Sequence, residues 1–514
     1  MVKPIRLISG IMTVGFWTMA SRVLGLARDI LIASLIGPGP VMDAFIAAFR
    51  LPNMFRRFFA EGAFNAAFVP MFSKRYQSGE DALGFAREAF AGLALVLVLI
   101  CALALIFMPG LVWITAGGFA SDERFAMTVG FGRIVFPYIL LISLAALISG
   151  MLNATGRFSA AAAAPVLLNI LACTAMALGW FFGSKIILWL IWTIPLAGLA
   201  QLALVWLALE RAGLRLRPSR PRWTPRMKHL LQVAIPAALA GGVMQINLLV
   251  GQQVASHFDK AVSWLYNADR LYQLPLGVVG IAIGIVLLPD MSRRLAAGDE
   301  DGAQKALSRA AELSLAIALP CSLALVVIPL PLVSVLFERG ATSHEDARAM
   351  ALAVAIYGLG LPAFILQKLL QPLFFAREDT RRPFHYALMA MLFNAVCAIG
   401  LAPVIGWIAP AIATTLAGWI MVGQLLWGRR DMGYAARFDA RFFRRLWRIA
   451  LAAVIMSLAL LGGQALLETW LYTDHLRYGA LVLLIGIGVL IYGFAGQAFG
   501  AFSISDLRGV LRRR

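Results

Sequence analysis

Charged residues are scarce in this chain of 514 residues, of which 14% are charged and 61% are hydrophobic. Because a soluble domain is about half apolar and about a quarter charged, this composition excludes a soluble globular enzyme. Acidic residues are the scarcer kind, with 26 Asp and Glu against 45 Lys and Arg and a net charge of +19. In so apolar a chain we expect the basic excess in cytoplasmic loops, not on a nucleic-acid-binding surface.

Cysteine and histidine are also rare, with four and five residues. The cysteines lie far apart in apolar runs and form no CxxC pair, which predicts packed free thiols. The chain has no HExxH pattern, no P-loop lysine motif and no GxSxG turn. These absences argue against a metalloprotease, an ATPase and a serine hydrolase, and we expect neither a metal nor a cofactor.

Long apolar segments fill most of the chain, whose mean hydropathy is +0.82. A membrane-spanning helix needs about 20 mostly apolar residues. We interpret fourteen segments as such helices, and the first two are the least apolar because they carry charges. The first lacks a cleavage site, so it is not a signal peptide. The predicted spans are 8–36, 43–72, 88–115, 126–152, 159–182, 186–209, 229–256, 264–290, 310–337, 348–376, 383–404, 408–428, 449–467 and 478–503.

The basic residues between these spans predict the orientation. With both termini in the cytoplasm, the cytoplasmic segments hold 31 Lys and Arg, and the opposite side holds six. Lys and Arg accumulate in short cytoplasmic loops. The asymmetry therefore supports fourteen spans with cytoplasmic N- and C-termini, since one missed helix would scramble the alternation.

Two parts of the chain resemble each other. The segment 70–81 resembles 289–300 at an offset of 219, and four further residues recur at an offset of 225. These are Pro137, Thr155, Arg157 and Asn169, matched by Pro362, Thr380, Arg382 and Asn394. A repeat of six helices keeps its orientation in the membrane. We therefore predict an all-α polytopic membrane protein with two six-helix pseudo-symmetric halves, 1–228 and 229–428, around a central cavity. A basic linker and two C-terminal helices follow in 429–514.

Charges inside the predicted spans require a separate explanation. An arginine at the bilayer centre costs about 2.5–3.5 kcal/mol even on the gentler insertion scales, so these side chains must face protein or water. Apart from Glu88, Asp290, Glu312 and Arg348, which lie within three residues of the end of a span, the cations outnumber the acids by four. The cations are Arg22, Arg28, Arg50, Arg56, Arg57, Arg133, Arg270 and Lys368, and the acids are Asp29, Asp43, Glu61 and Asp269.

Two explanations stay open for any single charge. Arg56 can extend from a helix end to the membrane surface, and Arg28–Asp29 or Asp269–Arg270 can take part in ion pairs that only hold the bundle together. Pairing cannot absorb a surplus of four, so we expect a cavity suited to an anion. Arginine favours phosphate and carboxylate because its planar group donates two parallel hydrogen bonds.

Eight stretches carry a resemblance to a known family. They are Ser21–Asp29, Asp43–Phe45, Leu51–Phe64, Ala67–Pro70, Phe136–Ser143, Ala268–Leu271, Pro275–Val278 and Ala376–Thr380. They are similar to the MurJ, or MviN, lipid II flippases of the bacterial inner membrane, over essentially the whole chain. That family belongs to the multidrug/oligosaccharidyl-lipid/polysaccharide exporter superfamily.

The resemblance implies a transporter and not an enzyme. Family members move lipid II, an undecaprenyl-pyrophosphate-linked disaccharide-pentapeptide, from the cytoplasmic to the periplasmic leaflet for peptidoglycan synthesis. We expect alternating access. The family's essential cavity residues correspond to Arg22, Arg28, Asp43, Arg56 and Arg270, the predicted substrate-binding set. Glu61 matches a further functional position, and we assign it with Asp29 and Asp269 to gating or ion pairs. The last two helices are implied to form a groove for the polyprenyl tail.

The energy source stays open between the membrane potential and an ion. Some family members bind sodium through a carboxylate on the seventh helix, but 229–256 contains no Asp or Glu. A sodium site of that kind is not expected, and Asp379 and Asn394 are the candidates for its remnants. The expected partners are lipid II, membrane lipids and, as candidates, downstream peptidoglycan synthases. We expect no nucleic acid and a monomer.

Three other functions fit the sequence less well. The main rival is another transporter of the same architecture, such as a drug or polysaccharide-lipid exporter. An exporter of cationic drugs should have net acidic cavity residues, whereas the excess here is basic. A membrane scaffold would not need arginines on several spanning helices. An intramembrane enzyme would need a catalytic dyad or metal set, which the sequence does not contain.

Overall fold

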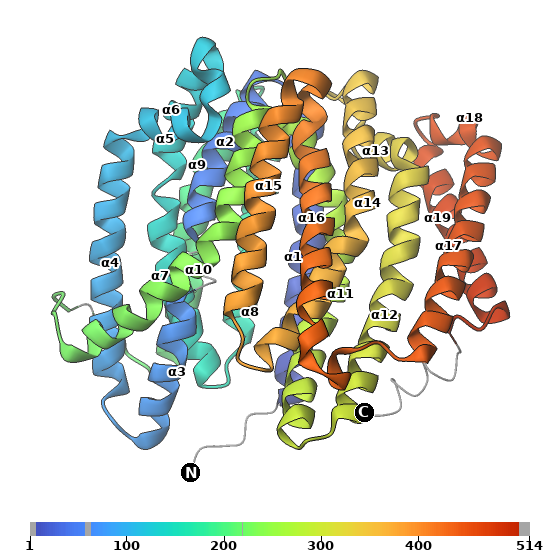
Figure 1. Ribbon diagram of the computed structural model, residues 1–514. Helices are drawn as coiled ribbons and strands as arrows, with labels where there is room; N and C mark the ends of the chain where they lie inside the picture. Colours follow the sequence, from blue (N-terminus) through green and yellow to red (C-terminus); the bar gives the residue numbers. More distant parts are fainter. Residues whose placement is uncertain (1–6, 57–62, 218, 503–514) are drawn as a thin grey trace. The chain divides into compact units, whose positions relative to one another are not determined.

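The chain folds into helices joined by short turns. The computed structural model describes residues 7–56, 63–217 and 219–502. Within these ranges every regular element is a helix (Figure 1). The helices pack into two compact units, Met1–Ser263 and Trp264–Arg514. The prediction of an all-α protein is therefore confirmed.

The first unit combines helix pairs that are close in the sequence with pairs that are far apart in it. α8 packs on α1 and α9, α7 on α9, α2 on α6, and α3 on α7 and α10. The elements are α1 (Leu7–Leu35), α2 (Pro40–Arg56), α3 (Ala63–Ser78), α4 (Ala82–Ile106), α5 (Met108–Ala116), η2 (Gly117–Ser121), α6 (Glu123–Val135), α7 (Tyr138–Ala154), α8 (Ser159–Phe181), α9 (Ile186–Arg211) and α10 (Pro225–Ala255).

The second unit repeats several of these pairings. α15 packs on α16, α14 on α12 and α16, and α17 on α12 and α19. The elements are α11 (Ala261–Ala296, from Trp264), α12 (Glu300–Val327), α13 (Pro329–Phe337), α14 (His344–Phe375), α15 (Arg381–Ile405), η3 (Gly406–Ile408), α16 (Ala409–Gly428), η4 (Arg430–Met432), η5 (Tyr434–Ala436), α17 (Ala440–Leu466), α18 (Glu468–Leu471) and α19 (Arg477–Ala498).

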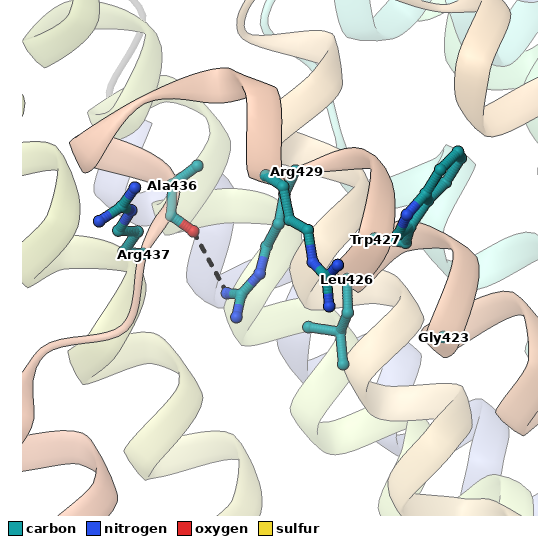
Figure 2. Close-up of a pocket in the computed structure, with 7 residues that line it drawn as sticks. Gly423, Leu426, Trp427, Arg429, Ala436 and Arg437 are labelled. Atoms are coloured by element: carbon teal, nitrogen blue, oxygen red, sulfur yellow. Dashed lines mark hydrogen bonds between the residues drawn. The ribbon is translucent and has the colours of Figure 1, made fainter.

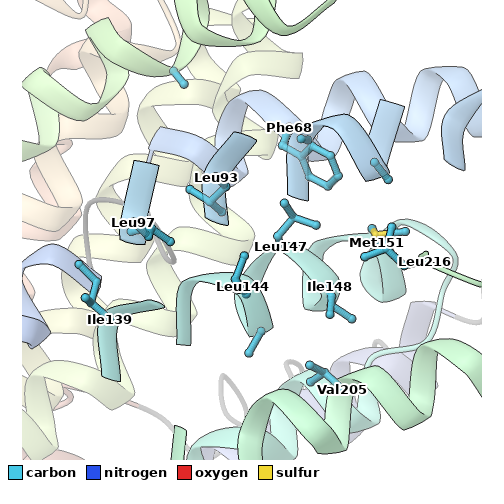
Figure 3. Packing of buried hydrophobic residues seen from close by; sticks show 14 of the residues in the cluster. Phe68, Leu93, Leu97, Ile139, Leu144, Leu147, Ile148, Met151, Val205 and Leu216 are labelled. Carbon is cyan, nitrogen blue, oxygen red and sulfur yellow. The ribbon is translucent and has the colours of Figure 1, made fainter. Parts of the chain in front are cut away.

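Buried apolar side chains hold each unit together. In the first unit Phe68, Leu97, Ile148 and Val205 join α3, α4, α7 and α9 with almost no exposed surface (Figure 3). In the second unit a smaller apolar cluster joins α13 to α17, α18 and α19. Its buried members are Ile328, Val335, Met456, Leu460, Leu467, Leu471, Ala480, Leu481 and Leu484.

A polar network, which we name the Glu312 network, fastens α17 to α12. The Glu312 carboxylate is 7% exposed and lies 3.3 Å from Arg445 and 3.8 Å from Arg441, both on α17. Arg309 pairs with Glu312 and with Asp439, the residue that caps the N-terminus of α17. The two C-terminal helices are therefore attached to the second unit by charge as well as by apolar packing.

Prolines break one long apolar segment at matching places in the two units. α4 ends before Pro109 and α12 ends before Pro329, and each break is followed by a helix of nine residues. Proline cannot donate a backbone hydrogen bond and suits the first turn of a new helix. The offset between the two prolines is 220, close to the offset of the sequence repeat.

The helices carry the surface of a polytopic membrane protein. Among the described residues, nine segments are long and apolar enough to cross a membrane. One of them, Arg381–Met432, contains both α15 and α16, so segments and crossings are not the same count. Large apolar side chains are exposed on these helices, for example Val489 at 64% and Phe494 at 74% on α19. Such surface is stable in lipid but not in water.

Candidate functional site

Arg28 on α1 is firmly fixed. Its Nε and Nη2 atoms donate hydrogen bonds of 3.0 and 2.7 Å to Asp29, and Nη1 donates one of 3.0 Å to Asn169 on α8. Asn169 donates to the carbonyl of Ser21, and a Cβ on Gly25 would lie 3.6 Å from the Asn169 side chain. The guanidinium is therefore held in one orientation between two helices. A prepositioned guanidinium of this kind is suited to binding carboxylate or phosphate.

The other predicted site residues of the first unit lie at separate points on its helices. Arg22 is partly exposed on α1, about 120° around the helix from the arginine six residues later. Arg56 is the last residue of α2, and its Nε donates a 3.3 Å hydrogen bond to Oδ1 of Asn53. Arg57 and the predicted gating residue Glu61 lie outside the described residues.

Asp43, near the start of α2, is fully buried. Its Oδ1 accepts a 2.9 Å hydrogen bond from the backbone N–H of Ser263 and another from the Ser263 hydroxyl. Its Oδ2 lies 3.5 Å from Nη1 of Arg124 at the start of α6. In this conformation Asp43 joins the ends of three helices, α2, α6 and α11.

Arg124 organises this end of the first unit although it is only 5% exposed. Its guanidinium pairs with Asp122 at 2.6 Å and with Asp259 at 3.5 Å, and it lies 4.4 Å over the ring of Phe119. The hydrogen bond from Arg124 is the main cause that holds the pKa of Asp122 below its ordinary value. Arg124 is not predicted as a site residue, because it falls between the predicted spans 88–115 and 126–152 and no local sequence pattern there indicates burial.

Backbone hydrogen bonds tie α10 to the same end. The N–H groups of Gly117 and Gly118 donate to Gln253 at 2.7 Å and to Ser256 at 2.9 Å. A side chain on Gly118 would meet the backbone of Ser256, so the close approach of η2 to α10 requires glycine. Asp43, Arg124 and these bonds form one polar closure, which we name the Arg124 closure.

In the second unit, Asp269 and Arg270 are neighbours on α11 with different partners. The Cζ of Arg270 lies 4.5 Å from the centre of the Tyr266 ring, and Arg270 donates a hydrogen bond to the Tyr266 hydroxyl. Asp269 accepts a hydrogen bond from Gln273. Lys368 is exposed on α14.

The candidates for a remnant sodium site have protein partners. Asp379 pairs with Arg382 at 3.3 Å, and Asn394 is 1% exposed and accepts a 3.4 Å hydrogen bond from Thr414. Among the residues that the structure describes, no group of three or more His, Cys, Asp or Glu side chains is placed to hold a metal ion.

Comparison with known proteins places the chain in a family. A sequence model described as lipid II flippase MurJ matches residues 32–485. The chain belongs to the lipid II flippase MurJ family. It is 43% identical to a probable lipid II flippase MurJ of Rhizobium meliloti (strain 1021), with 98% of this chain and 95% of the relative covered.

Solved structures agree with this assignment. A MurJ structure in an inward closed conformation matches with a TM-score of 0.81 and 25% identity, covering 95% of this chain and 98% of the other. An inward-facing multidrug resistance MATE transporter of the MOP superfamily matches with a TM-score of 0.65 and 15% identity, over 82% of this chain and 96% of its own. The second likeness is one of fold alone.

Proposed function

We propose that this protein is a flippase that moves lipid II from the cytoplasmic to the periplasmic leaflet of the bacterial inner membrane by alternating access. The observation that carries the proposal is the family match over residues 32–485 in a chain that keeps arginines on its membrane helices. Lipid II has a pyrophosphate and peptide carboxylates, so its headgroup is anionic. Arginine is the side chain best suited to such groups.

The proposed architecture has fourteen spanning helices and a central cavity between two halves. The halves are 1–228 and 229–428, and 429–514 adds a groove for the polyprenyl tail. The matching proline breaks at Pro109 and Pro329 support the repeat. The compact units instead divide after Ser263, because α10 packs on α3 and α5. The boundary of the compact units is defined by helix packing, whereas the boundary of the proposed halves is defined by the sequence repeat.

In the proposed mechanism, Arg22, Arg28 and Arg270 bind the diphosphate and the sugar-peptide head. Arg56, Asp43 and Glu61 form and break pairs as the two ends of the cavity open in turn. The bonds from Asp43 to Ser263 and Arg124 support this role, because they join the ends of α2, α6 and α11 and would have to separate for these helix ends to move apart. The protein acts as a monomer and delivers lipid II to peptidoglycan synthases.

The proposed orientation puts both termini in the cytoplasm. Single cysteines in a cysteine-free variant test it, at the exposed positions Ser219 and His475. A membrane-impermeant maleimide should label His475→Cys in cells with a permeable outer membrane, and Ser219→Cys only after the inner membrane is opened. The reverse pattern would contradict the orientation.

Depletion in living cells tests the function. Lipid II on the periplasmic face should fall when the protein is depleted and recover when the wild-type chain is supplied. Arg270→Gln should fail to restore it. Arg217→Gln, an exposed loop variant with the same chemical change, is the matched control and should restore it. Unchanged periplasmic lipid II after depletion would refute the flippase proposal, provided that immunoblots show the protein is gone.

A further inference from the structure

A basic pocket lies at the end of α16, apart from the predicted substrate site. It has a volume of about 490 Å³ and is lined by Gly423, Leu426, Trp427, Arg429, Arg430, Ala436 and Arg437 (Figure 2). The lining includes three arginines and no carboxylate. Its volume falls within the range of about 300–1,000 Å³ that small-molecule sites occupy.

The walls of this pocket are fixed by hydrogen bonds. Arg429 donates a 3.2 Å hydrogen bond to the carbonyl of Ala436 and stacks 4.3 Å over the ring of Phe438. Arg377, in the α14–α15 turn, donates to the carbonyl of Met432 at 3.0 Å, and Arg382, in the first turn of α15, donates to that of Gly428 at 3.2 Å. The turn after α16 therefore has a defined shape, which is the condition for a selective site.

Two of the lining arginines are accessible to an anion that enters the pocket. Arg430 and Arg437 are exposed. Within residues 7–56, 63–217 and 219–502, no ion pair involves either side chain. Because Arg429 has no carboxylate partner in the pocket either, the three guanidinium groups give the site a strong positive potential.

The depth of the pocket in the membrane indicates what occupies it. α16 has 20 residues, which at 1.5 Å per residue is about 30 Å, the thickness of the hydrocarbon core. The residues after Gly428 therefore lie at the level of the lipid headgroups. Trp427, at the rim, is 65% exposed, and exposed tryptophans concentrate at this level of a bilayer. A soluble anion would gain no favourable contact from the apolar ring of Trp427 at this rim.

We propose that the pocket at the end of α16 binds the phosphate headgroup of an anionic phospholipid, with Arg429, Arg430 and Arg437 around the phosphate and Trp427 against the upper acyl chain. In the proposed orientation this lipid belongs to the cytoplasmic leaflet. The binding itself does not depend on which substrate the protein transports.

Native mass spectrometry of the full-length protein in detergent tests the proposal. Phosphatidylglycerol should bind at one saturable site more tightly than zwitterionic phosphatidylcholine. The double variant Arg430→Gln/Arg437→Gln should bind phosphatidylglycerol roughly 25-fold more weakly, since each arginine near an anionic surface contributes about fivefold. The matched control is Arg217→Gln/Arg220→Gln, which removes the same charge from an exposed loop of the first unit and should bind as the wild type does.

Two results would overturn the proposal. An equal loss of phosphatidylglycerol binding in both double variants would show that net charge, and not the pocket, attracts the lipid. Displacement of phosphatidylglycerol by an equal concentration of inorganic phosphate would assign the pocket to a free anion. Equal melting temperatures of the two variants would establish that neither outcome reflects unfolding.

Discussion

The residues of the Arg124 closure show what single positions contribute. Asp43 is recognisable from the sequence as a charge in an apolar span, and the structure finds it buried with two partners. Its partner Arg124 is not recognisable, because it lies in the polar first turn of α6, directly after the capping residue Asp122. Burial of Arg124 arises only when residues 43, 122 and 259 meet in three dimensions. A single sequence contains no signal for such a meeting.

Arg124→Gln should destabilise the protein by about 3 kcal/mol, because it leaves the buried carboxylate of Asp43 without its cation. Arg133→Gln, exposed on the same helix, is the control and should change stability little. Thermal unfolding in detergent measures both. The pKa of Asp122 is lowered by Arg124, so this part of the stabilisation is present above the ordinary carboxyl pKa and lost as the pH falls through the lower, folded-state value. A wild-type melting temperature in Arg124→Gln would contradict the role of the closure.

A second residue-scale prediction concerns backbone strain. Glu378 has a positive φ of 60° in the turn before α15, and Gly156 has a φ of 78° in the corresponding turn of the first unit. A side chain at positive φ costs about 1–2 kcal/mol. Glu378→Gly should therefore raise the free energy of unfolding by about 1 kcal/mol, and Gly156→Ala should lower it by a similar amount. Changes of the same sign in the two turns would disprove this explanation.

At the scale of elements, the apolar segments predict where helices lie but not where they break. A helix lies over every span predicted from residue 88 onward. Of the span predicted over 43–72, the described residues lie in α2 (Pro40–Arg56) and α3 (Ala63–Ser78), and 57–62 lie outside the described residues. The apolar content of a segment does not change where a helix ends and a new helix begins in another direction. The breaks before Pro109 and Pro329, and the nine-residue helices after them, could therefore not be predicted from it.

The Glu312 network makes a prediction about α17. Glu312→Gln removes the carboxylate that Arg445 and Arg441 approach, so repulsion among the remaining arginines should loosen the first turns of α17. Hydrogen exchange of the amides in 440–448 should become about tenfold faster, equivalent to about 1.4 kcal/mol of local stability. Glu300→Gln, exposed on the same helix, should leave their exchange unchanged. Equal amide exchange rates in the two variants would show that Glu312 does not help to attach α17.

At the scale of the whole molecule, most of the net charge of +19 lies in loops and only a small part on membrane helices. The orientation can be predicted from the loop charges, because the preference of Lys and Arg for cytoplasmic loops depends only on how many lie on each side. Asp29 is a candidate partner of Arg28 from the sequence alone, and it pairs with Arg28 at 2.7 Å. The second partner of Arg28, Asn169 on α8, could not be predicted, because that contact arises from helix packing. Arg270 contacts Tyr266, which precedes it by four residues on the same helix.

Membrane potential should drive transport of an anionic headgroup. An inside-negative potential favours its outward movement by about 2.3 kcal/mol per charge per 100 mV. In vesicles with a potassium diffusion potential, the rate of lipid II movement should rise with an inside-negative potential and fall when the potential is collapsed. Dissipating only the pH gradient is the control and should have no effect. A rate independent of the potential would eliminate this driving force.

The attachment of the two C-terminal helices has a mechanical consequence. The Glu312 network joins α17 to α12 near one end, and the apolar cluster joins α17 and α19 to α13 near the other. A pair of helices fastened at two separated points cannot pivot freely about either one. A tilt of α12 and α13 during transport would therefore carry α17 and α19 with it as one lever, and displace the lipid at their exposed faces by the same movement.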